Sequence, residues 1–143
     1  MKSDTSPLPA FDIRTGPRFQ VPGAVVSYRT KTKNPFVKTG EDHCPVLDIS
    51  RGGLLFICQT WLEIDTKIFL ELTLPGEKEK FSLKADVLWL TPREQEPETY
   101  EARVRFFPYG KKRKQNSPEA LIKIISLEKQ FMVRPGDTQK KAG

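Results

Sequence analysis

Two short motifs in this chain combine residue types that bind anions and planar nitrogen heterocycles. The first is R-x-x-x-R, formed by Arg14 and Arg18 around a Gly-Pro turn, and the second is D-x-S-x-x-G, formed by Asp48, Ser50 and Gly53. Guanidinium groups can hold phosphate oxygens, donate to O6 and N7 of guanine, or stack on a purine. A carboxylate accepts hydrogen bonds where guanine donates them, at N1 and N2. The two motifs together predict a binding site for an anionic ligand that contains guanine.

The two motifs differ in how readily they arise by chance. With nine arginines in 143 residues, an R-x-x-x-R pair is expected roughly 0.6 times at random. The D-x-S-x-x-G pattern is expected only roughly 0.02 times, because the chain contains seven Asp, seven Ser and nine Gly. Taken alone, Asp and Ser beside glycines usually bond to the backbone of their own turn, and glycine usually serves a positive φ. The presence of both motifs in one chain of predicted strands favours a ligand-binding role over a purely structural one.

The remaining reactive residues do not form a catalytic or metal-binding pattern. His43 is the only histidine and precedes Cys44, but no second cluster supplies the three or four ligands of a zinc site. The sequence has no glycine-rich phosphate loop before a helix, and no nucleophile paired with a general base. We therefore expect a binding protein rather than an enzyme, without catalytic residues, a metal or a catalytic cofactor.

Length and composition indicate one globular domain with tails. The chain is 37% hydrophobic and 29% charged, and it has no apolar run long enough to cross a membrane. The N-terminus lacks a secretory signal pattern, so we expect a cytoplasmic protein in which Cys44 and Cys58 are buried and reduced. The expected divisions are a flexible segment at 1–12, a domain at 13–131 and a disordered tail at 132–143.

The charge of the chain is positive and unevenly distributed. Its net charge is +6, and residues 111–114 form a continuous block of three lysines and one arginine. A positive balance favours anionic partners. Such a block is most often a solvated connection, although it could steer a phosphate-bearing ligand toward the domain or add charge to a site.

Alternating apolar residues predict the strands that must position the motifs. Strands are predicted at residues 24–29, 46–50, 54–58, 67–74, 81–90 and 100–107, with an exposed loop at 31–41. Asp48 and Ser50 share one face of their strand and precede a hairpin turn. In the strand at 81–90 the apolar alternation continues through Trp89. Six strands with no helix between them indicate an antiparallel barrel or sandwich, dominated by β-structure.

A helix is predicted after the last strand. Ser117 is suited to be its N-cap, and Pro118 is suited to be its first residue. Leu121, Ile124 and Ile125 then form an apolar stripe that should pack on the sheet.

The motifs, the six strands and the closing helix together resemble the PilZ domain family, over roughly residues 12–131. The end of the last predicted strand, at 104–106, also looks like the final barrel strand of that family. The resemblance implies a six-stranded antiparallel β-barrel with a C-terminal α-helix that binds the bacterial second messenger cyclic di-GMP. The motif positions that carry over are Arg14, Arg18, Asp48, Ser50 and Gly53.

The resemblance also implies how such a receptor would work. The flexible arginine segment would fold over the messenger, which is a disorder-to-order switch. The signal would then pass to an effector protein, with Tyr109, the block at 111–114 or the closing helix as candidate contacts. Two other functions stay open. One is a PilZ-like adaptor that works by protein contact without the messenger. The other is a small-barrel binder of single-stranded nucleic acid, which predicts aromatic residues alternating along one exposed strand face.

Overall fold

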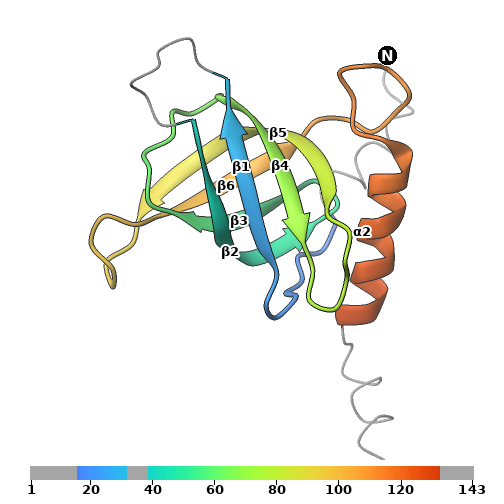
Figure 1. Cartoon of the computed structure of the whole chain (residues 1–143), viewed down its shortest axis with the longest axis horizontal. Coiled ribbons are helices and arrows are strands. Elements are labelled where there is room, and N and C mark those ends of the chain that lie inside the picture. The colour runs from blue at the N-terminus through green and yellow to red at the C-terminus, as the bar shows by residue number, and fades with distance from the viewer. Residues whose placement is uncertain (1–15, 32–38, 133–143) are drawn as a thin grey trace, which may run out of the picture.

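The computed structural model describes residues 16–31 and 39–132. Within these ranges the chain forms six β-strands and one α-helix (Figure 1). The elements in chain order are β1 (Val25–Thr30), β2 (Gly40–Ser50), β3 (Gly53–Cys58), β4 (Lys67–Thr73), β5 (Phe81–Pro92), β6 (Tyr100–Phe106) and α2 (Pro118–Phe131). The segments predicted at 1–12 and 132–143 lie outside the described residues apart from Met132, and so does Arg14.

The strands close into a barrel. Their order around it is β1-β2-β3-β6-β5-β4, and every neighbouring pair is antiparallel. This arrangement confirms the predicted six-stranded antiparallel barrel and excludes the sandwich. Because the sheet closes on itself, its strands present no open edge to another chain.

Alternation along the strands separates the core from the surface. In β4, Ile68, Leu70 and Leu72 are buried inside the barrel, whereas Phe69 and Glu71 point outward and are exposed. The same two-residue period fills the interior from the other strands. The largest fully buried side chains include Tyr28, Phe56, Ile49, Leu54, Leu83, Val87 and Val104.

β2 begins earlier than its sequence predicts. The loop predicted at 31–41 ends before Gly40, and residues 40–45 pair with β1. This part of β2 has a poor strand composition, and its His43 has a φ of 58°. The register with β1 shifts between Val26 and Tyr28, which accommodates the irregularity. Pairing with β1 therefore overrides the local preference of these residues.

β5 is longer than predicted and contains a bulge. It extends to Pro92, which the sequence places in the following loop, and its register with β6 shifts between Val87 and Trp89. The extra residue, Leu88, breaks the alternation. Trp89 therefore lies on the outside of the barrel with 36% of its surface exposed, although the apolar pattern puts it on the same face as Val87.

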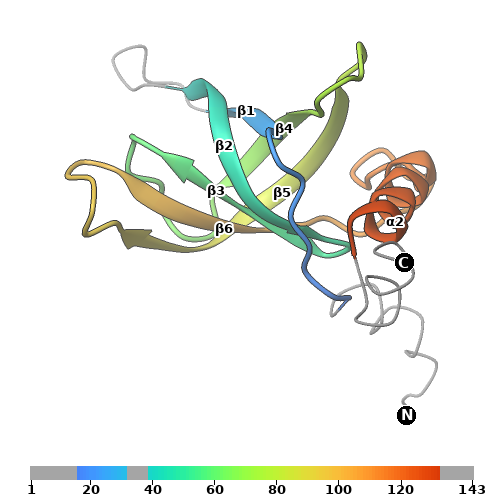
Figure 2. The same cartoon turned by 90° about the horizontal axis from the view of Figure 1, so that it is seen from below.

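α2 lies along one side of the barrel (Figures 1 and 2). Ser117 is its N-cap, with its Oγ accepting from the Ala120 amide at 3.2 Å, and Pro118 is its first residue, as predicted. The buried positions are Ala120, Ile124 and Leu127, so the packed face is turned slightly from the predicted stripe. In the described part of the chain, no helix has the length and apolar character needed to span a membrane.

The cysteines are buried, and no disulfide joins them, as the sequence predicts. Burial raises the pKa of the Cys58 thiol from its usual 9.0 to about 12, and the nearby Glu41 carboxylate adds to the increase. Glu41 also accepts hydrogen bonds from the Tyr28 hydroxyl at 2.6 Å and from the Thr60 amide at 3.0 Å. This network keeps the thiol protonated and fixes the loop after β3.

Candidate ligand-binding site

The segment before β1 is attached to β2 by a two-way backbone bridge. The Phe19 amide donates to the Ile49 carbonyl at 2.9 Å, and the Ile49 amide donates to the Phe19 carbonyl at 2.8 Å. Both side chains are buried in the core. Figure 2 shows this blue segment running beside β2 toward the end of the barrel where α2 lies. The end of the R-x-x-x-R motif is thus fixed against the strand that carries the second motif.

The bridge determines which residues face each other. Antiparallel register from Phe19 and Ile49 puts Arg18 opposite Ser50 and Gln20 opposite Asp48. Arg18 is exposed. Within the described ranges, no other group forms a hydrogen bond or ion pair with its guanidinium. None of its five donors is therefore used by an acceptor in the described part of the chain.

The second motif forms the predicted β2–β3 hairpin, with Ser50 paired to Gly53. The Ser50 hydroxyl accepts from the Gly52 amide at 3.2 Å and donates to the Gly53 carbonyl at 3.3 Å. Ser50 is 7% exposed. It therefore satisfies its own turn, which is the common structural role of serine beside glycines, and its remaining lone pair is available to a ligand.

Gly53 is required by close packing rather than by a left-handed backbone. Its φ is not positive. A Cβ at this position would collide with the Val104 carbonyl oxygen of β6, which is backbone that cannot easily move. The glycine thus permits the close pairing of β3 with β6.

Asp48 forms an ion pair that sequence reasoning missed. Arg103 of β6 donates from both terminal nitrogens to the two carboxylate oxygens, at 2.7 and 3.0 Å. Its side chain is 9% exposed and that of Asp48 is 17% exposed. Each carboxylate oxygen keeps a further lone pair for a ligand donor. Asp48 is therefore a fixed acceptor rather than a mobile one.

Arg103 belongs to a row of four neighbouring residues on the outside of the barrel. The register aligns Asp48 with Leu55, Leu55 with Arg103, and Arg103 with Trp89. Leu55 is buried beneath the ion pair, and the Arg103 guanidinium lies 5.9 Å from the centre of the Trp89 ring. The sequence does indicate that Arg103 faces outward. Its neighbours Ala102 and Val104 are the inward-pointing residues of β6, so the residue between them points out of the barrel.

Two hollows meet at Arg18. The motif hollow, of about 330 Å³, is lined by Gly16, Arg18, Ser50, Gly52, Gly53, Leu88, Arg103, Val104 and Arg105. The arm hollow, of about 530 Å³, is lined by Arg18, Phe19, Gln20, Pro22, Asp48, Phe131 and Met132. Both volumes are in the range of small-molecule sites. Three guanidinium groups line the motif hollow. Arg103 and Arg105 are paired with Asp48 and Asp86, so the charge that favours an anion there is that of Arg18.

The turn of the second motif is also joined to α2. The Arg51 guanidinium donates to both carboxylate oxygens of Glu128, at 2.8 and 3.2 Å. The Tyr109 hydroxyl donates to the Arg51 carbonyl at 2.6 Å, and burial raises the pKa of this phenol. Tyr109 is therefore a half-buried structural contact that fastens the turn of the second motif. The Arg51 side chain thus joins the turn of the second motif to α2.

The structure brings four of the five predicted site residues to one end of the barrel. Arg18, Asp48, Ser50 and Gly53 surround the two hollows, whereas Arg14 lies outside the described residues. The basic block at 111–114 does not line either hollow. Among the described side chains, no three His, Cys, Asp or Glu gather closely enough to hold a metal ion.

A comparison with protein-family models matches residues 12–121 to the PilZ domain. The match includes both motifs, all six strands and the first turn of α2. Comparisons with curated proteins and with solved structures found no match.

Proposed function

Because the chain belongs to the PilZ domain family, we propose that it is a receptor that binds cyclic di-GMP at the two motifs and passes the signal to a partner protein. PilZ domains are a family of cyclic di-GMP receptors and act as binding modules rather than enzymes. The residues proposed to contact the messenger are Arg14, Arg18, Asp48, Ser50 and Gly53. The proposal includes a cytoplasmic location, where buried thiols stay reduced.

The observation that carries the proposal is the position of Arg18. The Phe19–Ile49 bridge holds it opposite Ser50, its guanidinium has no partner within the described ranges, and it lines both hollows. An arginine fork left without an acceptor beside other guanidiniums is suited to phosphate oxygens or to O6 and N7 of guanine.

Asp48 would supply the complementary recognition. Guanine donates from N1 and N2, and the carboxylate can accept these bonds while Arg103 keeps it oriented. Trp89 would offer a partly exposed ring on which a base could stack, next to the Arg103 guanidinium. Arg103 and Trp89 thus extend the predicted site along one row of the barrel.

The signal has a physical route to the surface. Arg51 stands between Ser50 and Gly52 in the turn, and its side chain is bonded to Glu128 of α2. A ligand that shifts the turn would also shift this ion pair. Ordering of the segment that carries Arg14 would change the same end of the molecule, so the segment and α2 together would form the switched surface.

The two other functions receive less support. A nucleic-acid binder requires a row of exposed aromatic residues, yet Phe106 is buried and β4 exposes a single ring, Phe69, on its outer face. An adaptor that ignores the messenger has no need for an unpaired Arg18. The proposal therefore stays with cyclic di-GMP.

The site assignment is tested by titrating cyclic di-GMP into Arg18→Ala and Arg113→Ala, each of which removes one exposed positive charge. We expect Arg18→Ala to weaken binding by at least about tenfold, because it removes a charge-assisted contact. Arg113→Ala should bind as the unmodified chain does. Equal affinities for the two variants would contradict the assignment of Arg18.

A further inference from the structure

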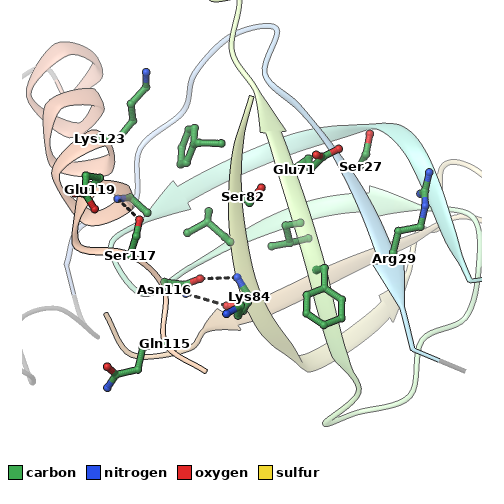
Figure 3. A pocket seen from close by; sticks show the side chains of 15 residues that line it. Ser27, Arg29, Glu71, Ser82, Lys84, Gln115, Asn116, Ser117, Glu119 and Lys123 are labelled. Atoms are coloured by element: carbon green, nitrogen blue, oxygen red, sulfur yellow. Dashed lines mark hydrogen bonds between the residues drawn. The ribbon is translucent and has the colours of Figure 1, made fainter. Parts of the chain in front are cut away.

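A second groove, of about 790 Å³, lies away from the two hollows. Its floor is the outer face of β1, β4 and β5, and one side is formed by residues 115–117 and the first two turns of α2 (Figure 3). None of the proposed messenger contacts lines it. We call it the outer groove, and the messenger site makes no use of it.

An aromatic ring between two cations occupies the floor of the outer groove. The register places Arg29 of β1 opposite Phe69 of β4, and Phe69 opposite Lys84 of β5. Phe69 is 48% exposed. Neighbouring strands are about 4.8 Å apart, so the two cationic residues start about 10 Å from each other. Figure 3 shows Arg29 and Lys84 extending from the strands on either side of β4.

A basic loop, residues 111–114, adjoins this floor. The buried Asn116 side chain accepts from the Lys84 amide at 2.6 Å and donates to the Lys84 and Phe107 carbonyls at 3.0 Å each. The Lys84 ammonium donates to the Arg113 carbonyl at 2.6 Å. These bonds attach residues 111–114, all four of them exposed and cationic, beside the groove. The surroundings therefore attract an anionic partner.

The outer groove suits an acidic polypeptide better than a nucleic acid. Glu71 and Glu119 line it, and they would repel a strand that carries a phosphate at every nucleotide. A polypeptide, in contrast, can carry carboxylates solely at the positions that face the cationic residues of the groove. It also needs just one apolar anchor, whereas nucleic acid binding relies on a series of stacking rings. The closed barrel offers no strand edge, so recognition must come from side chains.

We propose that the outer groove docks an acidic segment of a partner protein. An apolar side chain of the segment packs on Phe69, and carboxylates on one side of it contact Lys84 and the basic loop. On the other side a carboxylate shares Arg29 with the exposed Asp42, which pairs with Arg29 at 3.1 Å. In an extended segment alternate residues share a face about 7 Å apart, so the matching pattern is acidic-x-apolar-x-acidic. This proposal deepens the proposed function by naming the kind of partner, but docking itself does not require the messenger.

A fluorescein-labelled peptide with one phenylalanine between glutamates at alternate positions tests the proposal. Its fluorescence anisotropy is measured with the full chain at low salt. We expect binding that weakens with salt and falls about tenfold in Phe69→Ala, the loss typical of an anchor residue. Reversing charge with Lys111→Glu and Lys114→Glu together should weaken it further. Ile122→Ala is the matched control, because Ile122 is 66% exposed on α2 and does not line the groove.

Three results would overturn the docking proposal. One is no peptide binding, the second is equal binding by Phe69→Ala and the unmodified chain, and the third is tighter, Phe69-dependent binding of an oligothymidylate. Thermal unfolding of Phe69→Ala verifies that this variant is folded. Cyclic di-GMP is titrated into the same variant, where unchanged affinity is expected. A failure of docking is thereby separated from a failure of messenger binding.

Discussion

Arg103 and Asp48 form a two-bond ion pair across the outside of the barrel, with contacts of 2.7 and 3.0 Å over the buried side chain of Leu55. The pair connects β6 to β2 although β3 lies between them. It covers an apolar side chain, orients the carboxylate of the second motif, and places a guanidinium beside Trp89. One ion pair thus serves both the fold and the proposed site.

Arg103→Ala should lower the free energy of unfolding by about 3 kcal/mol, because it leaves a largely buried carboxylate without its partner. Urea denaturation measures the change. Arg105→Ala is the matched control on the same strand, since the Arg105–Asp86 contact is 3.4 Å and Arg105 is 54% exposed. The control substitution should lower the free energy of unfolding by under about 1 kcal/mol. Similar losses of unfolding free energy in both variants would show that the Arg103–Asp48 pair stabilises the fold no more than the exposed Arg105–Asp86 pair does.

Gly53→Ala should destabilise the barrel by about 3 kcal/mol, because the new methyl group must displace the Val104 carbonyl. Gly76→Ala provides the contrast. Gly76 has a φ of 82° and open space around it, so only backbone strain of about 1 kcal/mol is expected there. Chemical denaturation of the two variants compares the energetic cost of crowding at Gly53 with that of backbone strain at Gly76. A Gly53 variant no less stable than the Gly76 variant would refute the packing explanation.

Glu128→Gln should loosen α2 from the barrel, because it weakens the ion pair that joins the helix to the Arg51 turn. We expect a loss of about 1 kcal/mol and faster amide hydrogen exchange in the second half of α2. Glu77→Gln breaks the more exposed Lys123–Glu77 pair and should change little. Unchanged exchange in Glu128→Gln would mean that packing alone holds the helix.

Stability should fall as the pH rises from about 9 toward 12. The folded pKa of Cys58 is raised from 9.0 to about 12, mainly by burial. A raised pKa stabilises the fold below the unfolded value, and that stabilisation is lost as the pH rises through the folded value. Burial also raises the pKa values of Tyr28 and Tyr109, which acts in the same direction. Urea denaturation across this range measures the profile, and rising stability above pH 9 would contradict it.

The local parts of the site could be predicted from sequence. Alternation and glycine turns predict the hairpin that carries Ser50 and Gly53, because both depend on neighbours within one segment. The same reasoning predicts the helix start at Ser117, where a hydroxyl and a proline serve the first turn. The family resemblance supplied the closed barrel, which the pattern alone left open against a sandwich.

The parts that could not be predicted depend on distant segments. Arg103 contacts Asp48 from 55 residues away and across an intervening strand, so no periodicity within one strand reveals the pair. Trp89 points outward because of a bulge at Leu88, which reverses the phase of the alternation. Residues 40–45 join β2 only because β1 pairs with them. Pairing between strands that are distant in the sequence determines each of these features.

The central claim is that this chain binds cyclic di-GMP, and isothermal titration calorimetry of the messenger into the full chain tests it most directly. We predict a saturable heat of binding for the unmodified chain and a loss of at least about tenfold in affinity for Arg14→Ala. The absence of any binding heat in the unmodified chain, supported by unchanged thermal stability in excess messenger, would contradict the account.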